Sequence, residues 1–157
     1  MRSFFLLSIL LIGYMGVMPL NAQNDSPAER YLGYHSVDET YAFIDSIAQA
    51  FPEIVYIDTL GFSQKRAWPI IGLRISDNPT IDEDEPCVLF DGLHHAREPI
   101  SMEVCIDLID HLVSNYQTDG QITEWIDNTE IWIIPMINPD GWFYCHDKKL
   151  DSPYWRK

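Results

Sequence analysis

The spacing of apolar and polar residues along this chain predicts two long helices and one short helix. Apolar residues at helical spacing predict a helix over 37–51, a second one that follows Glu98 and reaches Tyr116, and a third over 121–127. Ser36-Val37-Asp38-Glu39 has the form of a capping box, so the first helix is expected to begin directly after Ser36.

Four other segments have the character of β-strands. The runs 54–60 and 68–75 are separated by a short polar connection and predict a hairpin. Cys87–Phe90 is wholly apolar, which is typical of a strand in the middle of a sheet. The run 130–137 predicts another buried strand, closed by a turn at 138–141. Strands that alternate with helices predict an α/β fold with a mixed sheet covered by helices.

The first 22 residues have the layout of a secretory signal peptide. A short basic start precedes the apolar run Phe4–Met18, and Ala22 supplies a small residue before polar sequence begins. An uncleaved anchor is the alternative, although the apolar run is short for a membrane span. We therefore expect a secreted or periplasmic protein, with residues 1–22 removed, 23–33 as a polar lead-in, and a folded domain from residue 34.

Charge and cysteine content limit the classes of partner. The chain has a net charge of −14, and removal of Arg2 with the signal peptide leaves about −15. Such an acidic protein should repel nucleic acid and anionic membrane surfaces, so we expect no nucleic-acid partner and no stable membrane association after cleavage. No Cys-x-x-Cys pair is present, and both Cys87 and Cys105 are expected to be buried thiols.

The most informative motif is Gly-Leu-His-His-Ala-Arg-Glu at 92–98, which directly follows the predicted strand at 87–90. His95 and Glu98 are three residues apart, so they can lie on one face of a helical turn and converge on one cation, while Arg97 points elsewhere. Nitrogen and carboxylate ligands suit zinc, and catalytic zinc sites often use two histidines and one glutamate. Sites in α/β folds also gather at the carboxyl ends of strands.

Several motifs together give the chain a resemblance to the zinc carboxypeptidase family, and in particular to the bacterial carboxypeptidase T-like members of the carboxypeptidase A group. The motifs are the 92–98 segment, Tyr34-His35-Ser36, Ile75-Ser76-Asp77-Asn78 with the acidic stretch after it, Asn138-Pro139-Asp140-Gly141, and Trp155-Arg156-Lys157. The resemblance implies a mixed, mainly parallel sheet sandwiched by helices. Residues 34–157 would form the N-terminal part of the catalytic domain, so the fold would be incomplete in this chain.

The same resemblance implies roles for individual residues. His95 and Glu98 would be ligands of a single zinc ion, Arg156 would polarise the scissile carbonyl and stabilise its oxyanion, and Arg97 would line the substrate subsites. The substrates would be the C-termini of peptides or proteins. The second histidine ligand and the glutamate general base would lie beyond Lys157, so residues 23–157 alone are expected to be marginally stable, to bind zinc weakly and to be inactive.

The remaining histidines and the acidic stretch offer further candidate ligands. His35, His94, His111 and His146 are each expected to be structural or exposed rather than to supply a third zinc ligand. In the acidic stretch, Asp77, Glu83 and Glu85 are candidate calcium ligands, because hard cations prefer clustered carboxylates on a loop. The plainer interpretation of that stretch is a solvated loop.

The sequence is compatible with three functions. The first is a secreted zinc metallocarboxypeptidase that hydrolyses C-terminal peptide bonds with zinc-activated water. The second keeps the same site but acts as an amidase or peptidase on cell-wall peptides. The third is a non-catalytic binding module that retains the fold alone.

Overall fold

The computed structural model describes residues 33–146, and its first element is helix α1 (Val37–Ala50). The predicted capping box is present: the Ser36 hydroxyl accepts a hydrogen bond from the Glu39 backbone amide, and the Glu39 carboxylate accepts one from the Ser36 backbone amide. These two bonds satisfy amides that the first turn of a helix leaves free, which explains why the helix begins where the sequence predicts.

The predicted hairpin follows as β1 (Val55–Phe62) and β2 (Pro69–Ile75), paired antiparallel. The connection is closed by a backbone hydrogen bond of 2.8 Å from the Ser63 amide to the Trp68 carbonyl. A connection this short can only join antiparallel neighbours.

The rest of the sheet is built through a helical crossover. Strand β3 (Cys87–Asp91) leads into α2 (Ile100–Asn115) and α3 (Gly120–Asp127), and β4 (Glu130–Ile134) then returns parallel to β3 and antiparallel to β2. The strand order is β1-β2-β4-β3, and α4 (Pro139–His146) follows the sheet.

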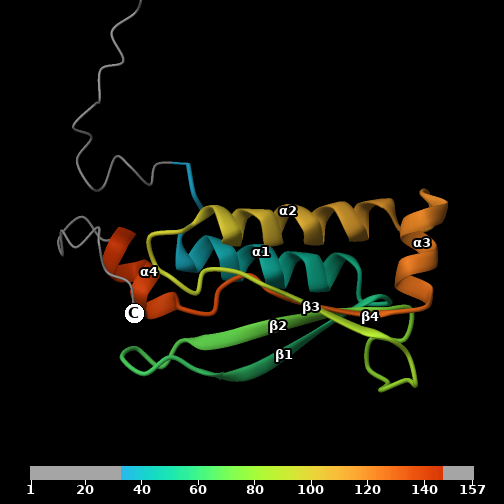
Figure 1. Ribbon diagram of the computed structural model, residues 1–157, viewed down its shortest axis with the longest axis horizontal. Coiled ribbons are helices and arrows are strands. Elements are labelled where there is room, and N and C mark those ends of the chain that lie inside the picture. The colour runs from blue at the N-terminus through green and yellow to red at the C-terminus, as the bar shows by residue number, and fades with distance from the viewer. Residues whose placement is uncertain (1–32, 147–157) are drawn as a thin grey trace, which may run out of the picture.

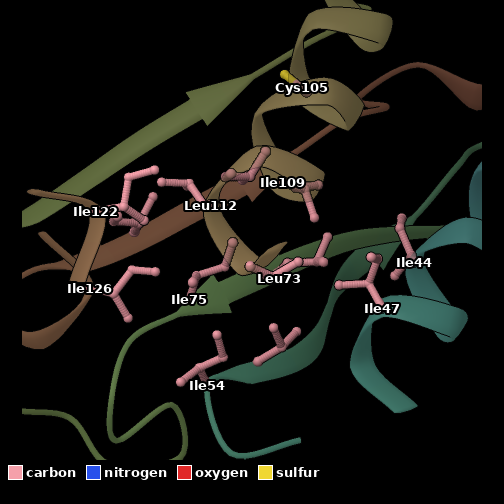
Figure 2. Packing of buried hydrophobic residues seen from close by; sticks show 14 residues of the cluster. Ile44, Ile47, Ile54, Leu73, Ile75, Cys105, Ile109, Leu112, Ile122 and Ile126 are labelled. Carbon is pink, nitrogen blue, oxygen red and sulfur yellow. The ribbon is translucent and has the colours of Figure 1, made fainter. Parts of the chain in front are cut away.

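Residues 33–146 contain two hydrophobic clusters, and the larger one joins α1, α2 and α3 to the sheet. In Figure 1, α1 and α2 lie side by side over the same face of the sheet, and α3 lies at one end. The side chains that meet between these layers are mostly isoleucine and leucine, as Figure 2 shows for Ile44, Ile47, Ile54, Leu73, Ile75, Cys105, Ile109, Leu112, Ile122 and Ile126. Truncation of one such buried Ile or Leu to alanine typically costs about 2–5 kcal/mol.

The mixed α/β fold is confirmed, although its described part differs from the expected sheet in two respects. Only the β3–β4 pairing is parallel, because the short hairpin connection and the return of β4 beside β2 make the other two pairings antiparallel. Among residues 33–146 the helices cover one face, and Phe62 and Leu89 on the strands remain 66% and 56% exposed. The second helical layer of a sandwich therefore does not lie within residues 33–146.

Strand β3 is placed differently from the prediction. It lies at the edge of the described sheet rather than in its middle, all five residues are exposed, and Cys87 is an exposed thiol instead of a buried one. An apolar run indicates that both faces tend to be covered, but it does not say which segment covers them. Cys105 is buried as expected.

Two further boundaries shift at the end of β4. The strand stops at Ile134 rather than at residue 137, and the expected turn at 138–141 forms the start of α4. Proline is favoured at the first position of a helix because its missing N–H is not needed there, and an acidic residue in the first turn complements the helix dipole. No helix within the described residues is long and apolar enough to cross a membrane.

Candidate functional site

The histidine-rich motif forms the connection between β3 and α2, at the carboxyl end of a sheet strand. His95 and Glu98 do not lie in a helix but in a turn, closed by a backbone hydrogen bond of 3.0 Å from the Glu98 amide to the His95 carbonyl. The turn brings the two side chains together as the motif predicts. His95 Nδ1 lies 2.9 Å from Glu98 Oε2, and both side chains remain partly open to solvent.

These two donor atoms fit one half of a zinc site. Tetrahedral zinc with nitrogen and oxygen ligands at about 2.0–2.2 Å places neighbouring donors roughly 3.3 Å apart. The observed 2.9 Å between Nδ1 and Oε2 therefore needs only a small side-chain rotation to admit an ion. Among residues 33–146 no third histidine, cysteine, aspartate or glutamate converges on this pair.

The backbone around the motif is tightly packed. A Cβ atom on Gly92 would lie 2.7 Å from the Ser101 carbonyl oxygen and 2.8 Å from that of Pro135. Only glycine permits the first turn of α2 and the end of β4 to approach this point so closely. This packing therefore constrains the backbone path of the loop where it leaves β3.

The start of α4 supports the same loop from the other side. The Asn138 side-chain amide donates to the His94 carbonyl at 3.2 Å and its oxygen accepts from the Gly141 amide at 2.9 Å. A Cβ on Gly141 would lie 2.9 Å from the Cβ of Ala96. The Asn-Pro-Asp-Gly motif therefore packs against the histidine motif, although the sequence alone indicates only a turn.

Of the two arginines predicted to contact substrate, Arg97 lies within the described residues and Arg156 does not. Arg97 is exposed beside the His95/Glu98 pair and makes no ion pair with any residue from 33 to 146. A guanidinium in this state is available to an incoming carboxylate or carbonyl. Arg156, in the Trp-Arg-Lys motif, lies outside the described residues, as do the predicted signal peptide and most of the polar lead-in.

The other described histidines have local partners. His94 Nε2 lies 2.9 Å from Asp91 Oδ1, and His35 Nδ1 lies 2.8 Å from Glu103 Oε2. The exposed His111 has its ring Nδ1 3.4 Å from the Asn115 side-chain nitrogen, and the His146 ring lies 5.1 Å from the ring of Trp142. Each arrangement accounts for its histidine without a metal.

The candidate calcium ligands are brought together by the loop after β2. Asp77, Glu83 and Glu85 each offer an oxygen, and the three oxygens lie within 4.8 Å of one another. Partial desolvation raises the pKa of the Glu85 carboxyl, and the nearby negative charges of Glu83 and Asp77 raise it further. Glu85 Oε2 is buried and accepts no hydrogen bond from residues 33–146, and a cation could satisfy a carboxylate oxygen in this state.

The acidic loop is fastened to the sheet by a buried ion pair that the sequence does not indicate. Arg74 Nη1 lies 3.4 Å from Glu130 Oε1, and both side chains are nearly inaccessible to solvent. The Arg74 guanidinium also donates to the Ile81 carbonyl, and Glu130 Oε1 accepts from the Glu83 amide at 3.2 Å. The position of the three carboxylates therefore depends on β2 and β4.

Comparison with known proteins agrees with this geometry. The family model described as zinc carboxypeptidase matches residues 40–157. A "Zinc carboxypeptidase" of Saccharothrix mutabilis subsp. capreolus is 39% identical over 113 residues, which are 71% of this chain and 25% of that protein. Carboxypeptidase B of Astacus astacus is 31% identical over 128 residues, or 81% of this chain and 39% of that protein.

A solved carboxypeptidase structure is also similar to this chain. The crystal structure of carboxypeptidase A from Helicoverpa armigera matches with a TM-score of 0.68 and 31% identity, covering 79% of this chain and 28% of that one. The chain spans between about a tenth and two fifths of the length of the curated relatives. This chain belongs to the zinc carboxypeptidase family. The narrower placement among carboxypeptidase T-like members stays a prediction.

Proposed function

We propose that this chain forms the N-terminal part of the catalytic domain of a secreted or periplasmic zinc metallocarboxypeptidase, which removes residues from peptide C-termini. The observation that carries the proposal is the convergence of His95 Nδ1 and Glu98 Oε2 within 2.9 Å on an accessible loop at the end of a sheet strand. Membership of the zinc carboxypeptidase family supports the choice of metal and of reaction.

His95 and Glu98 would hold a zinc ion, which when bound acts as a Lewis acid on the scissile carbonyl and activates the attacking water. Arg97, exposed beside them, would orient the peptide through its carbonyl or carboxylate groups. Arg156 would donate hydrogen bonds to the oxyanion as it forms, an interaction worth roughly 3–4 kcal/mol in comparable donor deletions. The third ligand and the general base would lie beyond Lys157.

Zinc titration with His95→Ala and His111→Ala tests the metal assignment. His95→Ala removes a direct ligand, so we expect a larger loss of zinc affinity than the roughly 10–100-fold caused by loss of an outer partner. His111→Ala is the matched control, because His111 is exposed on α2 and away from the pair. Equal zinc affinity of the two variants would overturn the assignment.

The reaction is tested with the complete protein on pairs of peptides whose C-terminus is either free or amidated. Hydrolysis of a peptide with a free C-terminal carboxylate, and not of its amidated counterpart, is the expected result. Cleavage of cell-wall peptide amides alone would favour the amidase alternative. Zinc uptake without hydrolysis of either substrate would favour a binding module. Residues 23–157 alone are expected to be inactive and to bind zinc weakly.

We also propose that Asp77, Glu83 and Glu85 hold a structural calcium ion. Two observations support the site: the three carboxylate oxygens lie within 4.8 Å of one another, and the buried Glu85 Oε2 has no hydrogen-bond partner among residues 33–146. Isothermal titration with Ca²⁺ tests it, with Glu85→Gln as the variant and the exposed Asp82→Asn as the control. Retention of Ca²⁺ binding by Glu85→Gln would contradict the assignment.

A further inference from the structure

The loop that carries His95 and Glu98 contains a backbone conformation that requires support. Leu93 has a φ of +53°, in the left-handed region that residues with a side chain rarely adopt, and its side chain is fully buried. The sharp change of direction at Leu93 turns the chain away from β3 and places His95 two residues further on. Such a conformation persists only where its surroundings hold it.

The hydroxyl of Ser101, in the first turn of α2, provides that support at both ends of the loop. Ser101 Oγ accepts a hydrogen bond of 2.9 Å from the Leu93 amide and donates one of 2.8 Å to the Glu98 carbonyl. Its backbone amide also donates to the Glu98 carbonyl at 3.3 Å. The Ser101 side chain thus connects Leu93, two residues before His95, to Glu98, the second candidate metal ligand.

We propose that Ser101 is a positioning residue for the metal-ligand pair, and that its hydroxyl sets the zinc affinity of the site. The inference rests on the proposed function, in which His95 and Glu98 bind zinc. Without the hydroxyl, the Leu93 amide loses its partner and the left-handed turn is free to relax. The same loss leaves the Glu98 carbonyl with the weaker 3.3 Å bond from the Ser101 backbone amide in place of the 2.8 Å bond from the hydroxyl, so the restraint common to both ends of the loop is removed.

The physical reason is preorganisation. The ligand atoms of a metal site bind most tightly when neighbouring groups already hold them in the bound arrangement, and loss of one outer partner typically weakens metal affinity about 10–100-fold. Asn138 holds the His94 carbonyl by a single bond of 3.2 Å. Ser101 is the stronger restraint, because its hydroxyl uses both its donor and one acceptor position on the loop.

The test compares three serine variants in the complete protein. Ser101→Ala removes the hydroxyl, and Ser101→Thr keeps it. Ser114→Ala is the matched control on the same helix, where the hydroxyl donates to the exposed Asp110 side chain at 3.4 Å. Zinc affinity is measured by competition with a chromophoric chelator, with Zn²⁺ as the only metal. The melting temperature of each metal-free protein is measured in parallel.

We expect Ser101→Ala to weaken zinc affinity about tenfold, and Ser101→Thr and Ser114→Ala to stay close to wild type. A purely structural serine would lower the melting temperature and leave the zinc affinity of the folded protein unchanged, and that result would overturn the inference. Titration at low temperature keeps Ser101→Ala folded if its melting temperature falls. If the wild-type protein takes up no zinc, the metal assignment fails and the positioning role fails with it. Normal wild-type uptake with an unaffected Ser101→Ala variant refutes the positioning role alone.

Discussion

The buried pair of Arg74 and Glu130 permits a quantitative test of how the acidic loop is held. Glu130→Gln keeps the shape of the side chain and an acceptor for the Glu83 amide, but it leaves the Arg74 guanidinium without a counter-charge. Both side chains are more than nine-tenths buried, so solvent cannot replace the lost partner. We expect the folded state to be destabilised and the loop to loosen.

The size of the effect follows from this burial. Removal of one partner of a buried ion pair costs about 3–5 kcal/mol, whereas replacement of both by apolar groups is often nearly neutral. The remaining bond from Arg74 to the Ile81 carbonyl favours the lower end, about 3 kcal/mol.

Urea denaturation of Glu130→Gln, Arg74→Met and the double variant measures the coupling between the two residues. Glu124→Gln is the control, because Glu124 is an exposed acidic residue on α3. We expect the double variant to be less destabilised than the sum of the single variants by more than about 1 kcal/mol. A Glu130→Gln protein as stable as Glu124→Gln, or additive single effects, would refute the reasoning.

Three further predictions concern the packing at Gly92, the partly buried Tyr41 and the acidic loop. Gly92→Ala should cost about 1–3 kcal/mol and weaken zinc binding, because the new Cβ meets two backbone oxygens; Gly61→Ala, with open space around it, is the control in a thermal melt. Tyr41→Phe should cost about 1 kcal/mol in urea, since the hydroxyl donates to the Pro69 carbonyl at 2.7 Å. Desolvation raises the pKa of Tyr41 to about 12 from 10, so the wild-type advantage should hold below pH 10 and vanish as the pH approaches 12. The raised pKa of Glu85 means that this carboxyl favours the folded state below its ordinary pKa, and that this contribution is lost as the pH rises through the raised value. Ca²⁺ binds the ionised carboxylate and offsets that loss, so Ca²⁺ should raise the melting temperature more at pH 7 than at pH 4. A pH-independent shift would contradict the calcium site.

The elements with local signals were predictable from the sequence. The capping box at Ser36 fixed the start of α1 to the residue, and the hairpin followed from two apolar runs with a short polar connection. His95 and Glu98 meet because a separation of three residues brings side chains together in a tight turn as well as in a helix. Local chemistry sufficed in each of these cases.

Features that depend on distant segments were not predictable in the same way. The apolar run at 87–90 indicates burial but not its neighbours, so the edge position of β3 and the exposure of Cys87 were missed. Ser101 carries no sequence signal, because a serine in the first turn of a helix is common and its partner Leu93 lies eight residues away. The start of α4 was also missed: the sequence was interpreted as a turn at 138–141, although Pro139 and Asp140 fit a helix-start pattern as well.

The free edge of β3 has a consequence for handling the protein. Within residues 33–146 no strand pairs with the outer edge of β3, and Val88, Leu89 and Phe90 on this strand are exposed, so the edge forms a template on which an identical strand from another molecule can pair. Preparations limited to residues 33–146 are therefore expected to aggregate as their concentration rises. Cys87 opens this strand as an exposed thiol, so oxidation can link the paired molecules covalently, and a reducing agent would limit the association to its reversible stage.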